Sequence, residues 1–428
     1  MKPILKRTVA AGAVVGLVAA GGTGPAQAAD PGVTRNQIVI GSTTDLSGPT
    51  SSAYGFVPKA AQVYFDYVNR SGGINGRDIK FVVKDDEYNP TKTVTATNEL
   101  LLDEEIFAMY GALGTANHQA VIDTLTDAEV PDVFVNTGAS IFDNVRKYPM
   151  TFPYFPSYAV EAKVMAKYIE DTASLRNKKR CFMYQEGEFG DNAGQGFAAA
   201  GMTDWEAQAS YLQSAARTPP IAQVSKLRNA DCELVVFFGV TTAAIGTLGA
   251  AAQLGFRPTW MINSVATEPT IYQAALGSTR GKALLNGVYT PSFLTPITDV
   301  GNPYVKQMKT LVEAAGLPWN FYTYYGVNTA YVLAQALEAT GRNLTRERLI
   351  DTLQTKSRSF RSAASVPFVI TKRSHQGLTG FWMGRYDSSG ELVRLGNKNR
   401  VYVAGNSSRS QAKVATFRPP DPTRKLLP

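Results

Sequence analysis

The chain has 428 residues, of which 44% are hydrophobic, and a formal net charge of +8. This length fits two domains of roughly 100–200 residues each, and the apolar content is sufficient for a core in both. The two cysteines and two histidines are widely spaced, so they do not form a zinc site by themselves, and no metal site is expected.

The first residues have the pattern of an export signal. Lys2, Lys6 and Arg7 precede an apolar stretch at 8–20, and the small-residue pattern Ala-Gln-Ala ends at Ala28. This order predicts a secretory signal peptide over residues 1–28, cleaved after Ala28. The leader contains no cysteine that could accept a lipid. We therefore expect a secreted or periplasmic protein that is not a lipoprotein.

Short apolar strands alternate with amphipathic helices along the rest of the chain. In the first half, strands are predicted at 38–41, 79–83, 106–110 and 130–135, with helices at 57–69, 90–103 and 117–128. The rhythm restarts with a helix at 160–172 and strands at 181–184, 209–212, 234–238 and 259–263. Helices at 303–315 and 324–340 and strands near 366–371 and 381–386 follow. This pattern predicts two doubly wound α/β domains with mostly parallel sheets.

The cysteines, Cys181 and Cys232, each lie at the start of a predicted strand. If these strands are parallel neighbours, the two Cβ atoms come within disulfide distance. Export permits a disulfide. Two buried free thiols are the alternative.

Glycine, serine and threonine dominate the segments that follow the strands. In open parallel sheets, ligands bind beyond the carboxyl ends of the strands. Glycine lets the backbone approach a ligand closely, and a helix N-terminus suits a carboxylate. Turn formation and helix capping are the alternative role for any single segment. The first-domain segments 42–55, 111–117 and 136–140, together with Tyr54, predict a binding crevice.

Several segments, in this order, carry a family resemblance: Leu46–Pro49 with Tyr54-Gly55, Asn69–Arg77, Asp85-Asp86 with Pro90, Gly111–Thr115, and Val130–Ser140. With them the sequence resembles the periplasmic branched-chain amino-acid (leucine/isoleucine/valine) binding proteins of ABC transporters, from about Ile38 to Tyr386. Such proteins have the type I periplasmic-binding fold, in which two lobes joined by three hinge crossovers close over a solute.

The resemblance implies a division of the chain into lobes. An N-terminal lobe is expected from residues 36–155 and 290–380, and a C-terminal lobe from 156–289 and 381–405. Residues 406–428 are expected to form a disordered tail. This tail is basic, but a disordered, soluble end is a commoner role for such a segment than nucleic-acid binding, and no nucleic-acid partner is expected.

The resemblance also implies the roles of individual residues. Tyr54 corresponds to an aromatic lid. Thr115 and Ser140 correspond to hydroxyl and backbone donors for a ligand carboxylate, and Gly138 offers a main-chain group. The segment 130–140, with 154–158 and Glu161, is also similar to family members that carry aromatic acids.

In the second lobe the sequence departs from the family pattern. Family tyrosines correspond here to Phe189 and Thr241, and the acid that pairs with the ligand ammonium corresponds to Ser264. A buried ammonium without a counter-charge is costly. Either another acid serves, or the solute has no amine at that place. The candidate acids are Glu186, Glu188, Asp191 and Glu268.

Enzymatic alternatives find little support. A dinucleotide-binding enzyme needs Gly-x-Gly-x-x-Gly directly after the first strand, and Gly41-Ser-Thr-Thr-Asp-Leu stands there instead. The Gly-x-Ser-x-Gly motif of hydrolases does not occur. Asp85 and Asp86 follow a strand and precede a helix that begins with proline, so loop hydrogen bonding is expected of them rather than catalysis.

We therefore expect a monomeric extracytoplasmic binding protein without a cofactor. It would capture a small hydrophobic carboxylate-bearing solute, similar to a branched-chain amino acid, for uptake through ABC-transporter permease subunits. Two alternatives remain open at this stage: capture of amine-free acids or amides, and service as the ligand-binding component of a sensor system.

Overall fold

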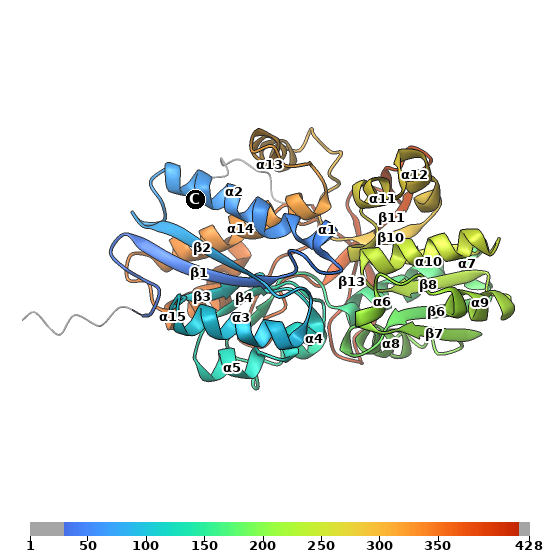
Figure 1. The fold of residues 1–428 in the computed structure, drawn as a ribbon, viewed down its shortest axis with the longest axis horizontal. Helices are drawn as coiled ribbons and strands as arrows, with labels where there is room; N and C mark the ends of the chain where they lie inside the picture. The colour runs from blue at the N-terminus through green and yellow to red at the C-terminus, as the bar shows by residue number, and fades with distance from the viewer. Residues whose placement is uncertain (1–29, 419–428) are drawn as a thin grey trace, which may run out of the picture.

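The computed structural model describes residues 30–418, so the expected signal peptide lies outside the described residues. Figure 1 shows two lobes side by side, each with a central sheet covered by helices. The first sheet has the order β2-β1-β3-β4-β5, and every pairing in it is parallel. Its strands are β1 (Gln37–Thr44), β2 (Asp78–Asp85), β3 (Ala108–Tyr110), β4 (Asp132–Val135) and β5 (Thr151–Pro153).

Helices from two distant parts of the chain cover the first sheet. The early ones are α1 (Ser51–Tyr54), α2 (Phe56–Arg70), α3 (Pro90–Leu102), α4 (Thr115–Gln119), α5 (Ile122–Asp127) and the 3-10 turn η1 (Ser140–Asp143). The late ones are α13 (Pro303–Ala314), α14 (Phe321–Thr340), α15 (Arg346–Lys356) and η4 (Ser357–Ser359). Gly326 lets α14 lie directly on α2, because a Cβ there would be 2.3 Å from the backbone oxygen of Val57.

The second sheet has nine strands in the order β14-β13-β11-β10-β9-β8-β6-β7, with β12 beside β11. The neighbours β10, β9, β8, β6 and β7 pair in parallel, in this order. The pairings of β11 with β10, β12 and β13, and of β13 with β14, are antiparallel. The strands are β6 (Arg180–Gln185), β7 (Ala207–Tyr211), β8 (Leu234–Phe238), β9 (Thr259–Ile262), β10 (Tyr289–Ser292), β11 (Gly380–Tyr386), β12 (Leu392–Arg394), β13 (Arg400–Val403) and β14 (Lys413–Thr416).

The second sheet is covered by helices from the middle of the chain: α6 (Tyr158–Asp171), α7 (Ala173–Arg176), α8 (Glu188–Ala199), α9 (Ile221–Asn229), α10 (Thr241–Gln253), α11 (Pro269–Leu276) and α12 (Ser278–Leu285), with 3-10 turns η2 (Gln213–Ala215) and η3 (Ser264–Ala266). No helix within residues 30–418 is long and apolar enough to cross a membrane.

The chain passes between the lobes three times: after β5, between β10 and α13, and between η4 and β11. The predicted fold class, two mostly parallel α/β lobes of the type I periplasmic-binding kind, is therefore confirmed. The two cysteines form a disulfide, with their Cα atoms 5.8 Å apart, and β6 and β8, the strands that they adjoin, pair in parallel.

Two expected elements differ in the structure. Residues 366–371 form no strand and make only isolated bridges, at Phe368 and Thr371, with residues that follow shortly in the chain. Pro367 removes a backbone N–H from this segment, which disfavours ladder pairing. The prediction of a disordered tail from residue 406 is wrong for residues 406–418. β14 lies in this segment and pairs with β13 as a hairpin.

The loop of this hairpin is held by buried polar contacts. Lys163 Nζ donates to the carbonyl oxygens of Gly405 and Ser407 at 2.9 and 2.7 Å. Asn406 accepts from Ser157 and donates to Asp143 at 2.8 Å. These partners are far away in sequence, so composition alone suggested a free end.

Candidate functional site

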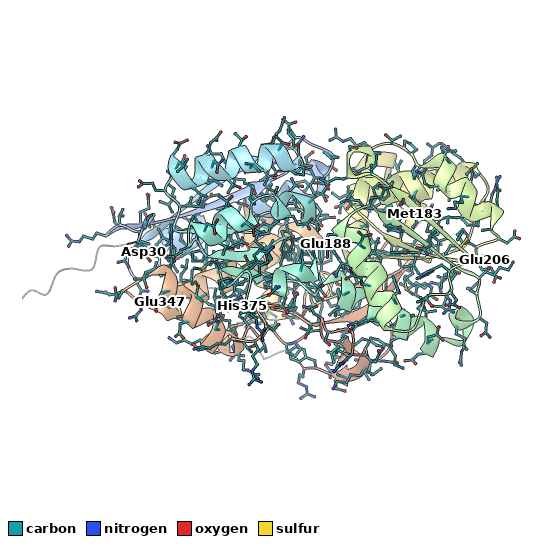
Figure 2. All side chains as sticks on the ribbon, turned by 90° about the horizontal axis from the view of Figure 1, so that it is seen from below. Asp30, Met183, Glu188, Glu206, Glu347 and His375 are labelled. Carbon is teal, nitrogen blue, oxygen red and sulfur yellow. A yellow bond between two sulfur atoms is a disulfide. The ribbon has the colours of Figure 1, made fainter. Side chains whose placement is uncertain are left out.

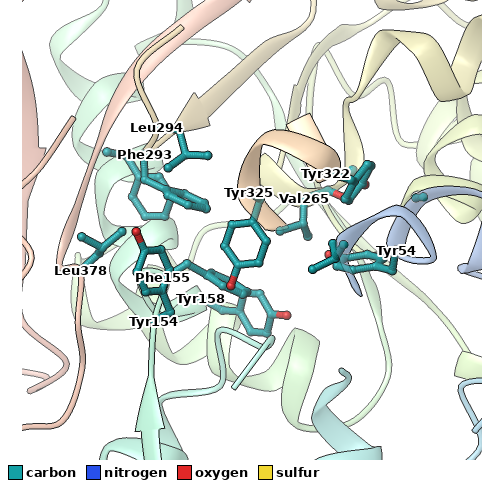
Figure 3. Close-up of a cluster of buried hydrophobic side chains, with 14 of the residues drawn as sticks. Tyr54, Tyr154, Phe155, Tyr158, Val265, Phe293, Leu294, Tyr322, Tyr325 and Leu378 are labelled. Carbon is teal, nitrogen blue, oxygen red and sulfur yellow. The ribbon is translucent and has the colours of Figure 1, made fainter. Parts of the chain in front are cut away.

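An aromatic cluster lies where the two lobes meet (Figure 3). Tyr54 from α1 packs against Tyr322 from α14, with ring centroids 5.0 Å apart. Tyr158, the first residue of α6, stacks on Phe189 of α8 at 4.2 Å. All four rings are buried. The expected aromatic residues, Tyr54 and Phe189, are therefore both buried where the lobes meet, together with Tyr158 and Tyr322. We refer to this junction between the lobes as the crevice.

Three neighbouring groups of the first lobe form a set of donors that we call the oxygen cradle: the hydroxyls of Thr115 and Thr137 and the backbone N–H of Gly138. Thr115 begins α4 just beyond β3, and Thr137 and Gly138 follow β4. The two hydroxyls are 2.7 Å apart. Because the carboxyl ends of parallel strands lie at one edge of a sheet, residues from two loops converge here.

The Tyr158 hydroxyl occupies the oxygen cradle. Burial raises the pKa of the phenol to about 12, and the side chains of Thr137 and Thr115 and the backbone of Gly138 lie close enough to offset part of that rise by hydrogen bonding. Gly138 is required for this approach, because a Cβ there would be 2.7 Å from the Tyr158 ring. The cradle therefore binds an oxygen atom, and in this structure the protein itself supplies it.

The hydroxyl of Tyr158 should matter for stability. Tyr158→Phe leaves the cradle donors without their partner, and we expect the free energy of unfolding of the solute-free protein to fall by about 1–3 kcal/mol. Chemical denaturation measures it. Tyr325→Phe is the matched control, since the Tyr325 hydroxyl is buried and has no hydrogen-bond partner among the described residues. Equal stability of the two variants would contradict the role of Tyr158.

Ser140 connects the lobes instead of pointing into the cradle. Its backbone N donates to Asn192 Oδ1 at 3.1 Å, and Asn192 Nδ2 donates to the Ser140 hydroxyl at 2.6 Å. Asn192 lies on α8 of the second lobe, and its Oδ1 also accepts from Ala159 N at 3.2 Å. The sequence analysis missed Asn192, because nothing in its local context distinguishes it from an ordinary helix residue.

Thr241 makes a second connection across the crevice. Its hydroxyl lies 2.7 Å from the hydroxyl of Tyr322 and donates to the Val265 carbonyl at 3.1 Å. Farther out, Gln213 of the second lobe donates to the carbonyl of Tyr88 at 2.8 Å, and Arg217 donates to that of Gly48. Together these hydrogen bonds hold the two lobes in a closed arrangement.

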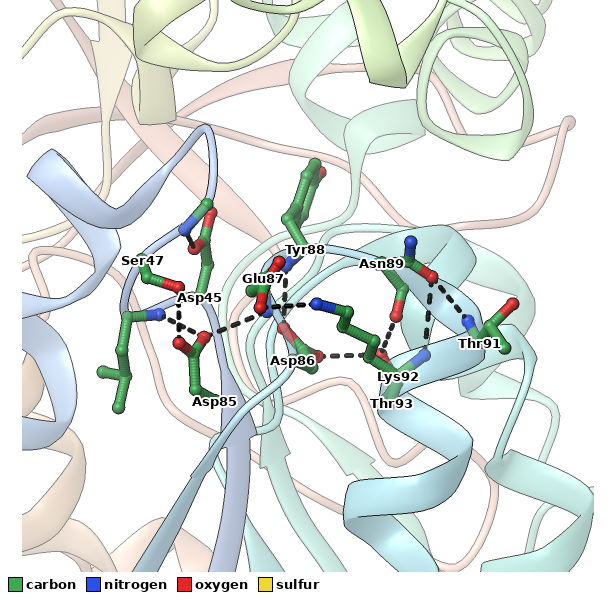
Figure 4. Close-up of polar contacts among 12 residues, drawn as sticks. Asp45, Ser47, Asp85, Asp86, Glu87, Tyr88, Asn89, Thr91, Lys92 and Thr93 are labelled. Atoms are coloured by element: carbon green, nitrogen blue, oxygen red, sulfur yellow. Dashed lines mark hydrogen bonds and ion pairs between the residues drawn. The ribbon is translucent and has the colours of Figure 1, made fainter.

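Three aspartates stiffen the first-lobe loops that border the crevice (Figure 4). Asp45 accepts from Thr50 N at 2.6 Å, and Asp85 accepts from Leu46 N at 2.9 Å. Asp86 accepts from Tyr88 N and the Thr93 hydroxyl, and burial raises the pKa of its carboxyl to about 6. Asp85 and Asp86 thus make the loop hydrogen bonds expected from the sequence.

The four candidate acids in the second lobe have different environments. Glu186 is exposed and accepts from the Ser210 hydroxyl, and Asp191 is exposed. Glu188 is partly buried where the lobes meet (Figure 2). Glu268 is buried, but backbone N–H groups of Thr270 and Phe321 occupy its two oxygens at 3.0 and 2.9 Å.

A different acid lies against Ser264. Glu161 Oε1 accepts from the backbone N of Ser264 at 2.6 Å, although the two residues are 103 positions apart. Glu161 is fully buried, and burial raises the pKa of its carboxyl to about 8. Its place in the first turn of α6, three residues after Tyr158, was visible in the sequence. Its contact with Ser264 was not. On its far side, Ser264 borders a cavity of about 270 Å³ that Phe321 and Trp382 also line.

No cluster of histidine, cysteine, aspartate or glutamate that could hold a metal ion occurs in residues 30–418. Both histidines are buried and hydrogen-bonded within the protein. A ring nitrogen of His118 lies 2.7 Å from a carboxylate oxygen of Asp132, and one of His375 lies 2.9 Å from the Thr151 carbonyl oxygen.

The sequence is similar to known binding proteins. A family model described as "Periplasmic binding protein" matches residues 37–391. The Leu/Ile/Val-binding protein homolog 3 of Brucella melitensis is 24% identical over 71% of this chain and 79% of its own length. The substrate-binding protein BasB of a chemotactic signal transduction system in Halobacterium salinarum is 25% identical, over 71% and 74%.

Solved structures agree with the observed architecture. A substrate-binding periplasmic protein of Ralstonia solanacearum superposes with a TM-score of 0.75 at 25% identity, over 84% of this chain and 100% of that one. A branched-chain amino acid ABC transporter protein of Thermus thermophilus with bound valine has a TM-score of 0.73 at 16% identity, over 85% and 97%. The latter similarity concerns the fold alone.

Proposed function

Since the chain belongs to the periplasmic binding protein family, we propose that it captures a small hydrophobic carboxylate-bearing solute outside the cytoplasm and delivers it to the permease subunits of an ABC transporter. One observation carries the choice of solute class. The oxygen cradle offers one hydroxyl hydrogen, because the hydroxyls of Thr115 and Thr137 hydrogen-bond with each other, and the backbone N–H of Gly138 to a single oxygen among buried aromatic rings. Such donors suit a carboxylate, and the rings suit an apolar side chain.

The proposed mechanism is capture without chemistry. In the open protein the Tyr158 hydroxyl leaves the cradle, and the solute carboxylate takes its place. The lobes then close, and the Ser140–Asn192 and Thr241–Tyr322 hydrogen bonds form across the crevice. The solute stabilises the closed state because it binds that state better than the open one. The closed surface is the form that the permease recognises.

An apolar groove lies between the lobes and is lined by residues next to Tyr54 and Thr241 in the sequence. It has a volume of about 530 Å³, runs between α1–α2 and α10–α11, and is bordered by Phe56, Ile245, Ile271 and Ala274, with Lys59 at its edge. Service in a sensor system is the second candidate function, and the similarity to BasB of the halobacterial chemotactic system favours it. Both functions use the same capture step.

A solute panel tests the proposal. The mature protein would be screened by thermal shift with branched-chain and aromatic amino acids, their deaminated acids, benzoates, amides and sugars. We expect stabilisation by carboxylates and none by sugars. A solute at 100 times its Kd adds about 2.7 kcal/mol of stability. Stabilisation by sugars alone, or by no member of the panel, would refute the proposed solute class.

The cradle itself is tested by Thr115→Val, which replaces a hydroxyl by a methyl group of similar size. Loss of one hydrogen bond to a charged group costs about 1.5–3 kcal/mol, so we expect roughly 10- to 100-fold weaker binding of the carboxylate found in the screen. Thr247→Val on α10 is the control, because Thr247 is equally buried and lies outside the crevice. Calorimetric titration measures both. Unchanged affinity in Thr115→Val would show that the carboxylate binds elsewhere.

A further inference from the structure

The structure points to a specific partner for one more group of the solute. We propose that Glu161 binds an ammonium group, so that the solute is a zwitterionic amino acid instead of an amine-free acid. This inference rests on the proposed function and deepens it. The acid stands on α6 rather than after β9, where the family resemblance places it, and it lies directly against the residue at that position, Ser264.

The geometry of Glu161 leaves one oxygen for a ligand. Oε1 is engaged by Ser264 N at 2.6 Å. Oε2 is buried and makes no hydrogen bond of normal geometry among the described residues, although the Ser264 hydroxyl lies close enough to lower the pKa of the carboxyl. A carboxylate oxygen in that condition is costly unless a cation or donor completes it. An ammonium group supplies both charge and donors.

Glu161 also lies in the correct part of the crevice. It is one helical turn from Tyr158, so both side chains project from the same face at the start of α6. Tyr158 reaches the oxygen cradle, while Glu161 reaches Ser264 and hence η3, whose Val265 carbonyl binds Thr241 and Tyr322. A solute that displaces the Tyr158 hydroxyl therefore has Glu161 beside it.

A purely structural role does not account for a carboxyl group here. Holding Ser264 N requires one neutral acceptor, which a glutamine would provide without the cost of burying an ionisable group. Three of the other acids do not fit this role: Glu268 has both oxygens engaged by backbone N–H groups, and Glu186 and Asp191 are exposed. Glu188 also has a buried oxygen, Oε1, without a hydrogen-bond partner among the described residues, but it is not hydrogen-bonded to Ser264, so the position of Glu161 against Ser264 decides between them.

Few charged groups lie near Glu161, so its protonation should depend mainly on burial and on the solute. Among the described residues, Tyr158 is the titratable side chain whose charge interacts with it. Lys163, on the same helix, is engaged by the carbonyls of Gly405 and Ser407. From α8, which packs on α6, Glu188 is partly buried at the lobe junction and Asp191 faces solvent.

The inference predicts a proton linkage. With a pKa near 8, Glu161 is largely protonated in the solute-free closed protein at pH 6 to 7. An ammonium favours the ionised form, so its binding releases a proton. Affinity for an amino acid should therefore rise by up to about tenfold per pH unit between pH 6 and 7.5. An amine-free acid should bind less tightly as pH rises, because it meets a developing negative charge.

The experiment compares matched solutes by calorimetric titration: L-leucine with 4-methylpentanoate, and L-phenylalanine with 3-phenylpropanoate. Each pair differs by the ammonium alone. We expect the wild-type protein to prefer the amino acid of at least one pair. Because binding releases a proton, the measured heat should change with the ionisation enthalpy of the buffer. In Glu161→Gln, amino-acid affinity should fall by about 100-fold and lose its pH dependence, while the amine-free acid binds at least as well as before.

Two controls separate the outcomes. Glutamine retains an acceptor for Ser264 N, so Glu161→Gln should remain folded, and Glu313→Gln on the exposed side of α13 should bind as the wild type does. Loss of amino-acid affinity in Glu188→Gln, with none in Glu161→Gln, would assign the ammonium to Glu188 and overturn the inference. Preference of the wild type for the amine-free acids, or equal binding of amino acids by wild type and Glu161→Gln, would overturn the role of Glu161 while leaving carboxylate capture in place. Failure of both members of both pairs, with no other carboxylate bound, would overturn the proposed function as well.

Discussion

Replacement of both Cys181 and Cys232 by alanine is expected to lower the free energy of unfolding by about 4 kcal/mol, a large part of the stability of a typical protein. The disulfide closes a loop with a sequence separation of 51 residues, and in the chain-entropy account a loop of that length constrains the unfolded state by about this amount. The bond joins the start of β6 to the residue shortly before β8, its parallel neighbour.

Urea denaturation followed by circular dichroism measures this loss. Part of the effect of alanine comes from removed side-chain volume, because both cysteines are buried. The wild-type protein under reducing conditions is therefore the necessary comparison, since it retains both sulfur atoms without the bond. If reduction left the urea midpoint unchanged, the disulfide would contribute nothing to stability.

Gly326→Ala is expected to have the second large effect, a loss of about 3 kcal/mol. A Cβ at this position would lie 2.3 Å from the backbone oxygen of Val57 in α2. No rotamer change relieves a clash with backbone, so α14 has to move away from α2. Because α14 carries Tyr322 and Tyr325 into the crevice, solute affinity should fall together with stability.

Gly249→Ala provides the matched control for this variant. Gly249 also lies inside a helix, α10, but a Cβ there meets no atom within 4 Å. Alanine is the better helix former, so this variant should gain up to about 1 kcal/mol. Thermal and urea denaturation of both variants give the comparison. Similar changes in the free energy of unfolding of the two variants would mean that α14 can move away from α2 at little cost.

Much of the architecture could be predicted because it depends on local patterns. Apolar runs such as 234–238 have the length and composition of buried strands, and the helix at 57–69 has a continuous apolar face. Their alternation restricts the chain to parallel sheets covered by helices. The pattern failed at 366–371, where buried apolar residues lie without a partner strand, because burial alone does not require pairing.

The candidate site was predictable only in part. Tyr54, Thr115, Gly138 and Phe189 are all buried where the lobes meet. Thr115 and Phe189 lie in the first turn of a helix and Gly138 follows β4, and such positions converge at one edge of the sheets in this fold. Ser140 lies at the same edge, but its contact is with Asn192 of the other lobe. Whether a donor faces a solute or another side chain depends on groups far away in sequence, which local pattern does not specify.

The α/β class, the presence of two α/β domains and the two strand starts that carry the cysteines could be predicted from the sequence alone, because each follows from periodicity and from residue types close together in the chain. The approach of Tyr158 to the oxygen cradle and the contact of Glu161 with Ser264 became visible in the folded protein. Tyr158 lies 20 positions after Gly138 and 43 after Thr115, and Glu161 lies 103 positions before Ser264. These contacts depend on how α6 packs between the lobes, which long-range burial and hydrogen bonding determine together.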